Sequence, residues 1–163
     1  MTGGTLKAKN VTIRVPPIHV NLSPLGFHYY AAQFLAVARS IESGPSFSPV
    51  PYYLYCRALE LSLKAYLLAK GLSKKELKKK SLGHNLERIL NRAEYYGLLL
   101  IVQVMDEERQ ELLKANNYYA DKDFEYANVS KIVRGYPELP DMIILDRLAE
   151  RLINELEPIC LEA

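Results

Sequence analysis

The chain has 163 residues, about the size of one domain, of which 49% are hydrophobic and 25% are charged. This composition is typical of a globular protein and argues against a disordered chain. The formal net charge of +2 is too small to indicate a dedicated nucleic-acid-binding protein by itself. The longest strongly apolar run, residues 98–102, is far shorter than the roughly 20 residues that span a bilayer.

Residues 1–24 predict an irregular or strand-like segment before the main domain. Residues 11–15 have high β-propensity, but Pro16 and Pro17 end that pattern. Residues 1–7 lack the apolar stretch of a signal peptide, so we expect none.

The rest of the chain predicts helices, because apolar residues recur at steps of three and four. The expected helices cover about 25–43, 51–70, 86–97, 106–119 and 140–157, with residues 98–104 left unassigned and 120–140 as a long connection. The predicted fold is therefore all-α, an up-and-down bundle of about five helices over residues 25–158, with a tail at 159–163.

Two cysteines, Cys56 in the second helix and Cys160 in the expected tail, are fewer than an extracellular disulfide framework uses. We expect reduced thiols in a cytoplasmic protein, with a single structural disulfide as the alternative.

The second helix, residues 51–70, is the most informative segment. It is apolar nearly all round, which predicts a helix surrounded by neighbours. It also carries Arg57, Glu60 and Lys64, whose i,i+3 and i,i+4 spacing places them on one ribbon. One interpretation is a structural ion network that fixes helix packing or a dimer interface, because buried charges must be paired. The other is a polar site where Arg57 and Lys64 bind a phosphate or nucleotide.

His84 and Asn85 precede the third helix and also allow two interpretations. Both could cap or link helices, since asparagine is a good N-cap residue. Alternatively, His84 faces Glu60 and Lys64 in a shared cleft and acts as an acid or base near neutral pH.

A dense run of lysines lies between the second and third helices. It is either a solvated helix or turn, or a contact for nucleic-acid phosphates. The residues concerned are Lys74, Lys75, Lys78, Lys79 and Lys80.

The sequence predicts no metal or other cofactor. The three histidines, His19, His28 and His84, are scattered, and no two stand at i,i+3 or i,i+4. The glycines are dispersed, so none of them forms a phosphate-cradling loop.

Three motifs in order resemble the HEPN family of small helical proteins. Residues 57–71 are similar to its central E-x-x-x-K-A-x-L-x-x-x-G helix, and residues 83–86, Gly-His-Asn-Leu, to the G-H-[DN]-L start of its next helix. The aromatic connection from Tyr118 to Pro137 looks like the segment before the last helix in many members. The resemblance covers roughly residues 27–157.

This resemblance implies a binding or interaction module. It suggests a homodimer that binds a nucleotide or RNA, or that accompanies a nucleotidyltransferase in a toxin–antitoxin or defence setting. Ribonucleases of the family carry an Arg-x4-6-His motif near the start of a late helix, and the matching place here lacks it. The Arg14 to His19 pair has this spacing but spans Pro16 and Pro17, so we interpret it as coincidence. A non-enzymatic module is therefore favoured, and the alternative is a metal-independent ribonuclease that uses His84 with a basic cluster.

Overall fold

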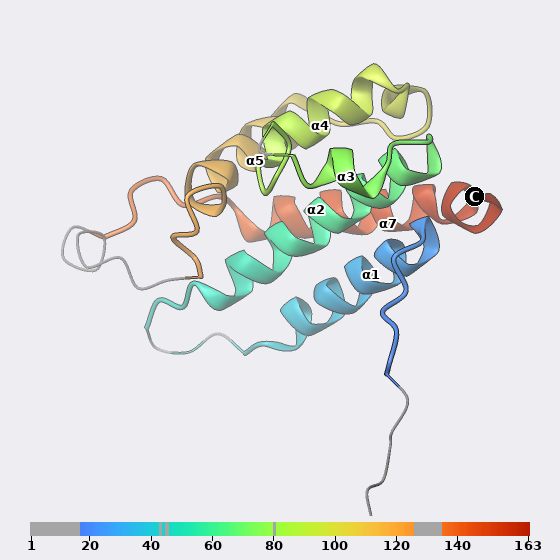
Figure 1. The fold of residues 1–163 in the computed structure, drawn as a ribbon. Coiled ribbons are helices and arrows are strands. Elements are labelled where there is room, and N and C mark those ends of the chain that lie inside the picture. Colours follow the sequence, from blue (N-terminus) through green and yellow to red (C-terminus); the bar gives the residue numbers. More distant parts are fainter. Residues whose placement is uncertain (1–16, 43, 45, 80, 126–134) are drawn as a thin grey trace, which may run out of the picture.

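The computed structural model describes residues 17–42, 44, 46–79, 81–125 and 135–163. Within these residues the chain forms six α-helices and one 3-10 turn and contains no strand, which confirms the all-α prediction (Figure 1). The elements are α1 (Pro24–Ser40), α2 (Val50–Ala69), α3 (Lys74–Leu77), α4 (Leu86–Tyr95), η1 (Leu98–Leu100), α5 (Asp106–Tyr119) and α7 (Met142–Glu162). Residues 11–15, predicted to be β-prone, lie outside the described residues.

Helix α2 lies at the centre of the bundle and contacts α1, α4, α5 and α7 (Figure 1). Its residues from Ala58 to Leu67 are all buried, which confirms the prediction of a helix with neighbours on most sides. The helices that bury these residues of α2 all belong to the same chain. The expected homodimer, which stays a prediction, must therefore use surfaces other than residues 58–67 of α2.

Short polar side chains begin several helices. Ser23 accepts a hydrogen bond from the backbone N–H of Gly26 at 3.1 Å at the start of α1, and Asp141 accepts one from Ile143 at 2.7 Å at the start of α7. The predicted starts of α1, α2, α5 and α7 agree with the structure within two residues. Gly97, with φ of 88°, ends α4 in the left-handed conformation and leads into η1 within the unassigned stretch 98–104.

The end of the last helix corrects the predicted boundary. α7 continues through Pro158 to Glu162, so residues 159–162 are helical rather than a tail. Proline costs one backbone hydrogen bond here, but burial of apolar groups in the next turn opposes this loss. Cys160 is 2% exposed and Ile159 packs against the core.

Both cysteines are buried and free, as expected for reduced thiols. Burial raises the pKa of the Cys160 thiol to about 11 and that of the Cys56 thiol further.

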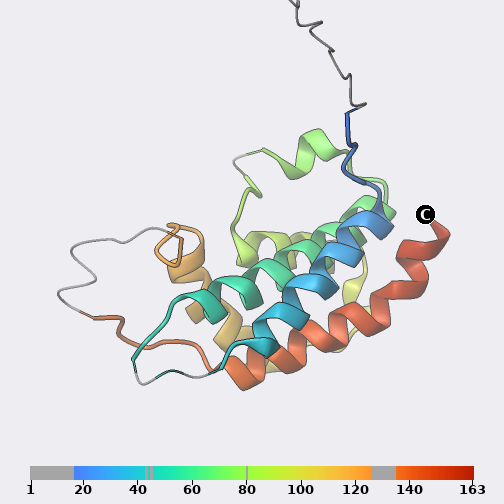
Figure 2. The same cartoon turned by 90° about the horizontal axis from the view of Figure 1, so that it is seen from below.

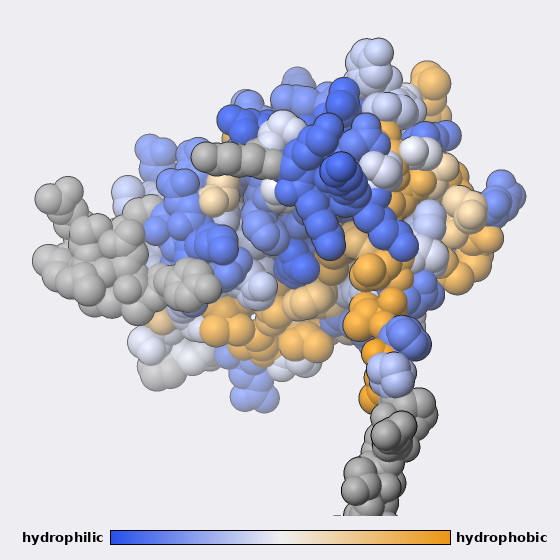
Figure 3. Space-filling model, viewed as in Figure 1, coloured by the Kyte–Doolittle hydropathy of each residue, from blue (hydrophilic) through white to orange (hydrophobic). Residues whose placement is uncertain are grey.

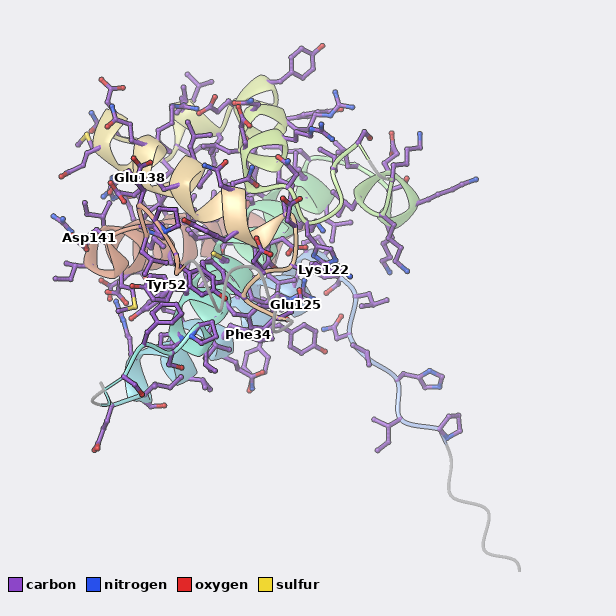
Figure 4. All side chains as sticks on the ribbon, turned by 90° about the vertical axis from the view of Figure 1, so that its left-hand side faces the viewer. Phe34, Tyr52, Lys122, Glu125, Glu138 and Asp141 are labelled. Carbon is purple, nitrogen blue, oxygen red and sulfur yellow. The ribbon has the colours of Figure 1, made fainter. Side chains whose placement is uncertain are left out.

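An aromatic cluster around Tyr52, which is labelled in Figure 4, joins the described ends of the long connection to the bundle. Phe47 and Tyr136 have ring centroids 4.8 Å apart, and Tyr52 on α2 stacks on Phe124 at 5.5 Å. Tyr118 on α5 contacts both Phe124 and Tyr136. These tyrosines are therefore packing residues at this end of the molecule. At the other end, residues 17–22 enter α1 beside α3, and α1 and α7 run side by side (Figure 2).

Candidate functional site

Glu60 on α2 is the centre of a buried polar cluster. Its side chain is 1% exposed. Oε2 accepts hydrogen bonds from Nη1 of Arg57 at 3.1 Å, from Nδ1 of His84 at 3.0 Å and from the Tyr119 hydroxyl. Oε1 accepts a hydrogen bond from Nζ of Lys64 at 2.5 Å. Every charged residue predicted for the polar ribbon thus meets at one carboxylate, together with His84.

The local sequence explains half of this arrangement. Arg57, Glu60 and Lys64 lie one helical turn apart, so their side chains extend along the same side of α2. Lys64 also donates a hydrogen bond of 2.6 Å to the carbonyl of Gly83, next to His84. That bond ties the turn before α4 to α2, and it places the His84 ring beside Glu60.

The charges around Glu60 keep it ionised. Burial by itself would raise the pKa of this carboxyl, but the hydrogen bond from His84 and the charges of Lys64 and Arg57 outweigh burial. The resulting pKa is lowered to about 2. Burial, together with the Glu60 charge, raises the pKa of the Tyr119 hydroxyl, so Tyr119 stays protonated and donates to Glu60.

The cluster opens to solvent through a cavity of about 380 Å³ between α2, α3 and the start of α1. The cavity has both polar and apolar lining residues. The polar lining residues are Arg57, Glu60, Lys64, Lys74, Lys78 and His84, and the apolar lining comes from Leu22, Phe27, Leu61 and Leu77. We call this space the Glu60 cavity. The side chains that surround Glu60 differ in exposure, from 43% for His84 to 27% for Arg57 and 10% for Lys64.

The lysine run divides into two groups. All four described lysines are exposed, but Lys74 and Lys78 line the Glu60 cavity, whereas Lys75 and Lys79 do not. Ser73 and Glu76 form a capping box that fixes the first turn of α3 and so sets which lysines face the cavity. Figure 3 shows the hydrophilic surface over α3 and, next to it, an apolar surface where the chain enters α1. Lys80 lies outside the described residues.

Asn85 serves the structural role that the sequence allowed. Its Oδ1 accepts a hydrogen bond of 2.9 Å from the backbone N–H of Arg88 and caps α4. It does not line the Glu60 cavity, so the structure separates Asn85 from the other four residues of the predicted polar site.

The sequence did not indicate Tyr119 or the apolar residues that line the cavity. Tyr119 is 59 residues from Glu60, and nothing in its local pattern distinguishes it from the other tyrosines. Phe27 and Leu22 fit an ordinary apolar helix face and an irregular segment. Their contribution appears only once α1 packs against α2.

Other predicted features do not add to this site. His19 is exposed in the segment before α1, and Arg14 lies outside the described residues. In the part of the chain that the structure describes, no three histidine, cysteine, aspartate or glutamate residues cluster as metal ligands would. Among the same residues, no helix combines the length and the hydrophobicity needed to cross a membrane.

Comparison with known proteins matched no family model, no curated protein and no solved structure. The resemblance to the HEPN family therefore stays a prediction from the motifs.

Proposed function

We propose that this protein binds a phosphate-bearing ligand, a nucleotide or a segment of RNA, in the Glu60 cavity. One observation carries the proposal: four cationic side chains, Arg57, Lys64, Lys74 and Lys78, line one cavity that contains a single carboxylate. That carboxylate is itself buried beneath them. The lining therefore has an excess of positive charge, which favours an anion.

The arrangement leaves donors for a ligand. Lys64 has three N–H donors, and two of them go to Glu60 and to the Gly83 carbonyl. Arg57 has five donors; one goes to Oε2 of Glu60 and the guanidinium also interacts with the Tyr119 hydroxyl, so most of its donors remain for a ligand. Glu60 thus holds both cations in fixed positions, which lowers the entropy cost of binding. The apolar lining, which includes Phe27 and Leu61, suits a base or another flat apolar group attached to the phosphate.

This ligand class agrees with what the HEPN resemblance implies. Under this proposal the protein is an accessory binding module, and a nucleotidyltransferase partner in a toxin–antitoxin or defence setting is the biological context that the resemblance suggests. The homodimer belongs to the same proposal and is tested by the molar mass in solution.

A binding titration tests the proposal. The intact chain is titrated at low salt with inorganic phosphate, with adenosine monophosphate and with a short single-stranded RNA. We expect saturable binding of at least one of these anions, weakening steeply as salt increases. Lys64→Met, which removes the charge and keeps the length of the side chain, should weaken binding. If none of the three probes binds at low salt, the cluster is a purely structural ion network.

A ribonuclease activity is the second candidate, and the His84–Glu60 hydrogen bond favours it. A histidine that donates through Nδ1 to a carboxylate can accept a proton at Nε2, which is what a general base for the RNA 2′-hydroxyl requires. We expect RNA cleavage in the presence of a chelator, lost in His84→Ala and kept in His19→Ala. Saturable RNA binding without cleavage would contradict the ribonuclease activity and support a binding module only.

A further inference from the structure

Hydrogen bonding fixes the ring of His84 in one tautomer. Nδ1 lies 3.0 Å from Oε2 of Glu60, and an ionised carboxylate only accepts, so the proton sits on Nδ1. In the neutral ring the lone pair is then on Nε2. Nε2 forms no hydrogen bond with any residue in the described ranges, and the side chain is 43% exposed. His84 therefore presents a basic, accessible nitrogen with a fixed orientation.

The surroundings of this nitrogen suit a group that carries several negative charges. His84 shares the Glu60 cavity with Arg57, Lys64 and Lys74. Fixed cations of this kind stabilise the equatorial oxygens of a phosphoryl group during its transfer. Glu60 has a second effect: a ring bonded to phosphorus at Nε2 while it keeps the Nδ1 proton is formally cationic, and the adjacent buried carboxylate offsets that charge.

The other two histidines lack this environment. His19 is exposed before α1 and does not line the Glu60 cavity. His28 is 6% exposed, and its Nδ1 has no hydrogen-bond partner in the described part of the chain. Burial lowers the pKa of His28 and also keeps reagents from it. The chain therefore contains its own controls for a reaction at His84.

We propose that Nε2 of His84 accepts a phosphoryl group from a small donor with a high-energy phosphorus bond, a phosphoramidate or a phosphoric anhydride. This rests on the proposed function, because the donor must enter the Glu60 cavity. The Nε2–P bond forms as the bond from phosphorus to its leaving group breaks, and the leaving group keeps the electron pair. For phosphoramidate, whose nitrogen is protonated, the leaving group is ammonia. The Nδ1 proton stays between His84 and Glu60, and no metal or redox partner is required.

The test is phosphorylation of the intact protein with potassium phosphoramidate at neutral pH. The product is followed by phosphorus NMR and located by mass spectrometry under conditions that preserve the acid-labile N–P bond. We expect His84 to react at least about tenfold faster than His19, because the site orients the ring and neutralises the incoming charge. Binding of inorganic phosphate is measured on the same sample.

His84→Asn is the sharpest variant. Its amide N–H can replace Nδ1 in the hydrogen bond to Glu60, whereas Nε2 is removed, so the label should disappear without loss of the fold. His19→Asn should leave the label on His84 unchanged. Phosphate binding with His84 reacting no faster than His19 would overturn the inference and leave the proposed function standing. If His84 does not react faster than His19, and if phosphate, adenosine monophosphate and RNA all fail to bind, both the inference and the proposed function are overturned.

Discussion

Nδ1 of His84 lies 3.0 Å from Oε2 of Glu60, although the two residues are 24 positions apart and belong to different segments of the bundle. The Glu60 side chain is 1% exposed, whereas the His84 side chain is 43% exposed. This hydrogen bond therefore connects a buried charge to the solvent-facing rim of a cavity. It makes the ion network on α2 both a structural element and a candidate binding site.

The ionised state of Glu60 predicts the behaviour of the protein in acid. The pKa of this carboxyl is lowered in the folded protein, from an ordinary value of 4.5 to about 2. The ionised Glu60 therefore contributes to the free energy of unfolding; this contribution is complete above pH 4.5 and is lost as the pH falls through about 2. It amounts to about 3 kcal/mol by linkage. Chemical denaturation across this range should show the loss, and Glu60→Gln should show a flatter curve. Parallel curves for the two proteins would contradict the assigned ionisation.

Tyr119→Phe should lower the free energy of unfolding by about 2 kcal/mol, because it removes a hydroxyl that donates to the buried Glu60 carboxylate. It should also move the acid transition to higher pH, since a donor to the charged form of Glu60 is lost. Tyr95→Phe is the control: Tyr95 is 80% exposed, and its change should stay within about 0.5 kcal/mol. Equal effects of the two substitutions would mean that the Tyr119 hydroxyl does not stabilise the cluster.

Asn85→Ala should separate capping from binding. Loss of the N-cap of α4 should lower the free energy of unfolding by about 1 kcal/mol. Anion affinity at low salt should be unchanged, because Asn85 does not line the Glu60 cavity. A clear loss of affinity in a variant that is still folded would restore Asn85 to the binding site.

The two thiols should be unreactive in the native state. Cys56 is fully buried and Cys160 is 2% exposed, and burial raises the pKa of both thiols, so little thiolate forms at neutral pH. A disulfide-exchange reagent should modify both only after unfolding in denaturant. Rapid native modification of Cys160 would indicate that the last turn of α7 opens.

Local patterns predicted the parts of the molecule that depend on local geometry. Helix periodicity located α2 and its ribbon, because residues three and four apart share a helix face wherever the helix lies. The predicted end of α7 was wrong, because proline at position 158 is a helix-stop signal in the sequence. That Cys160 is buried in the core beyond this proline is evident only from the folded structure. The contact of Tyr119 with Glu60 depends on how α5 packs, which no local pattern encodes.

The lysine run illustrates the same difference between local pattern and tertiary packing within one short segment. Its charge was evident from composition, but the sequence could not separate lysines that face a cavity from lysines that face solvent. That separation depends on where α3, a helix of four residues, rests against α2 and α1.

Paired charge reversals on α3 test the central claim most directly. Lys74→Glu/Lys78→Glu and Lys75→Glu/Lys79→Glu make the same change in net charge on the same short segment, but only the first pair lines the Glu60 cavity. The dissociation constant of whichever anion binds best is measured at low salt for both variants, after thermal melts show that they are folded. We predict at least about a tenfold loss of affinity for the first pair and a clearly smaller loss for the second, because only Lys74 and Lys78 line the cavity, whereas Lys75 and Lys79 would act on a bound anion through longer-range charge alone. Equal losses, or a greater loss for Lys75→Glu/Lys79→Glu, would show that the cavity is not the binding site.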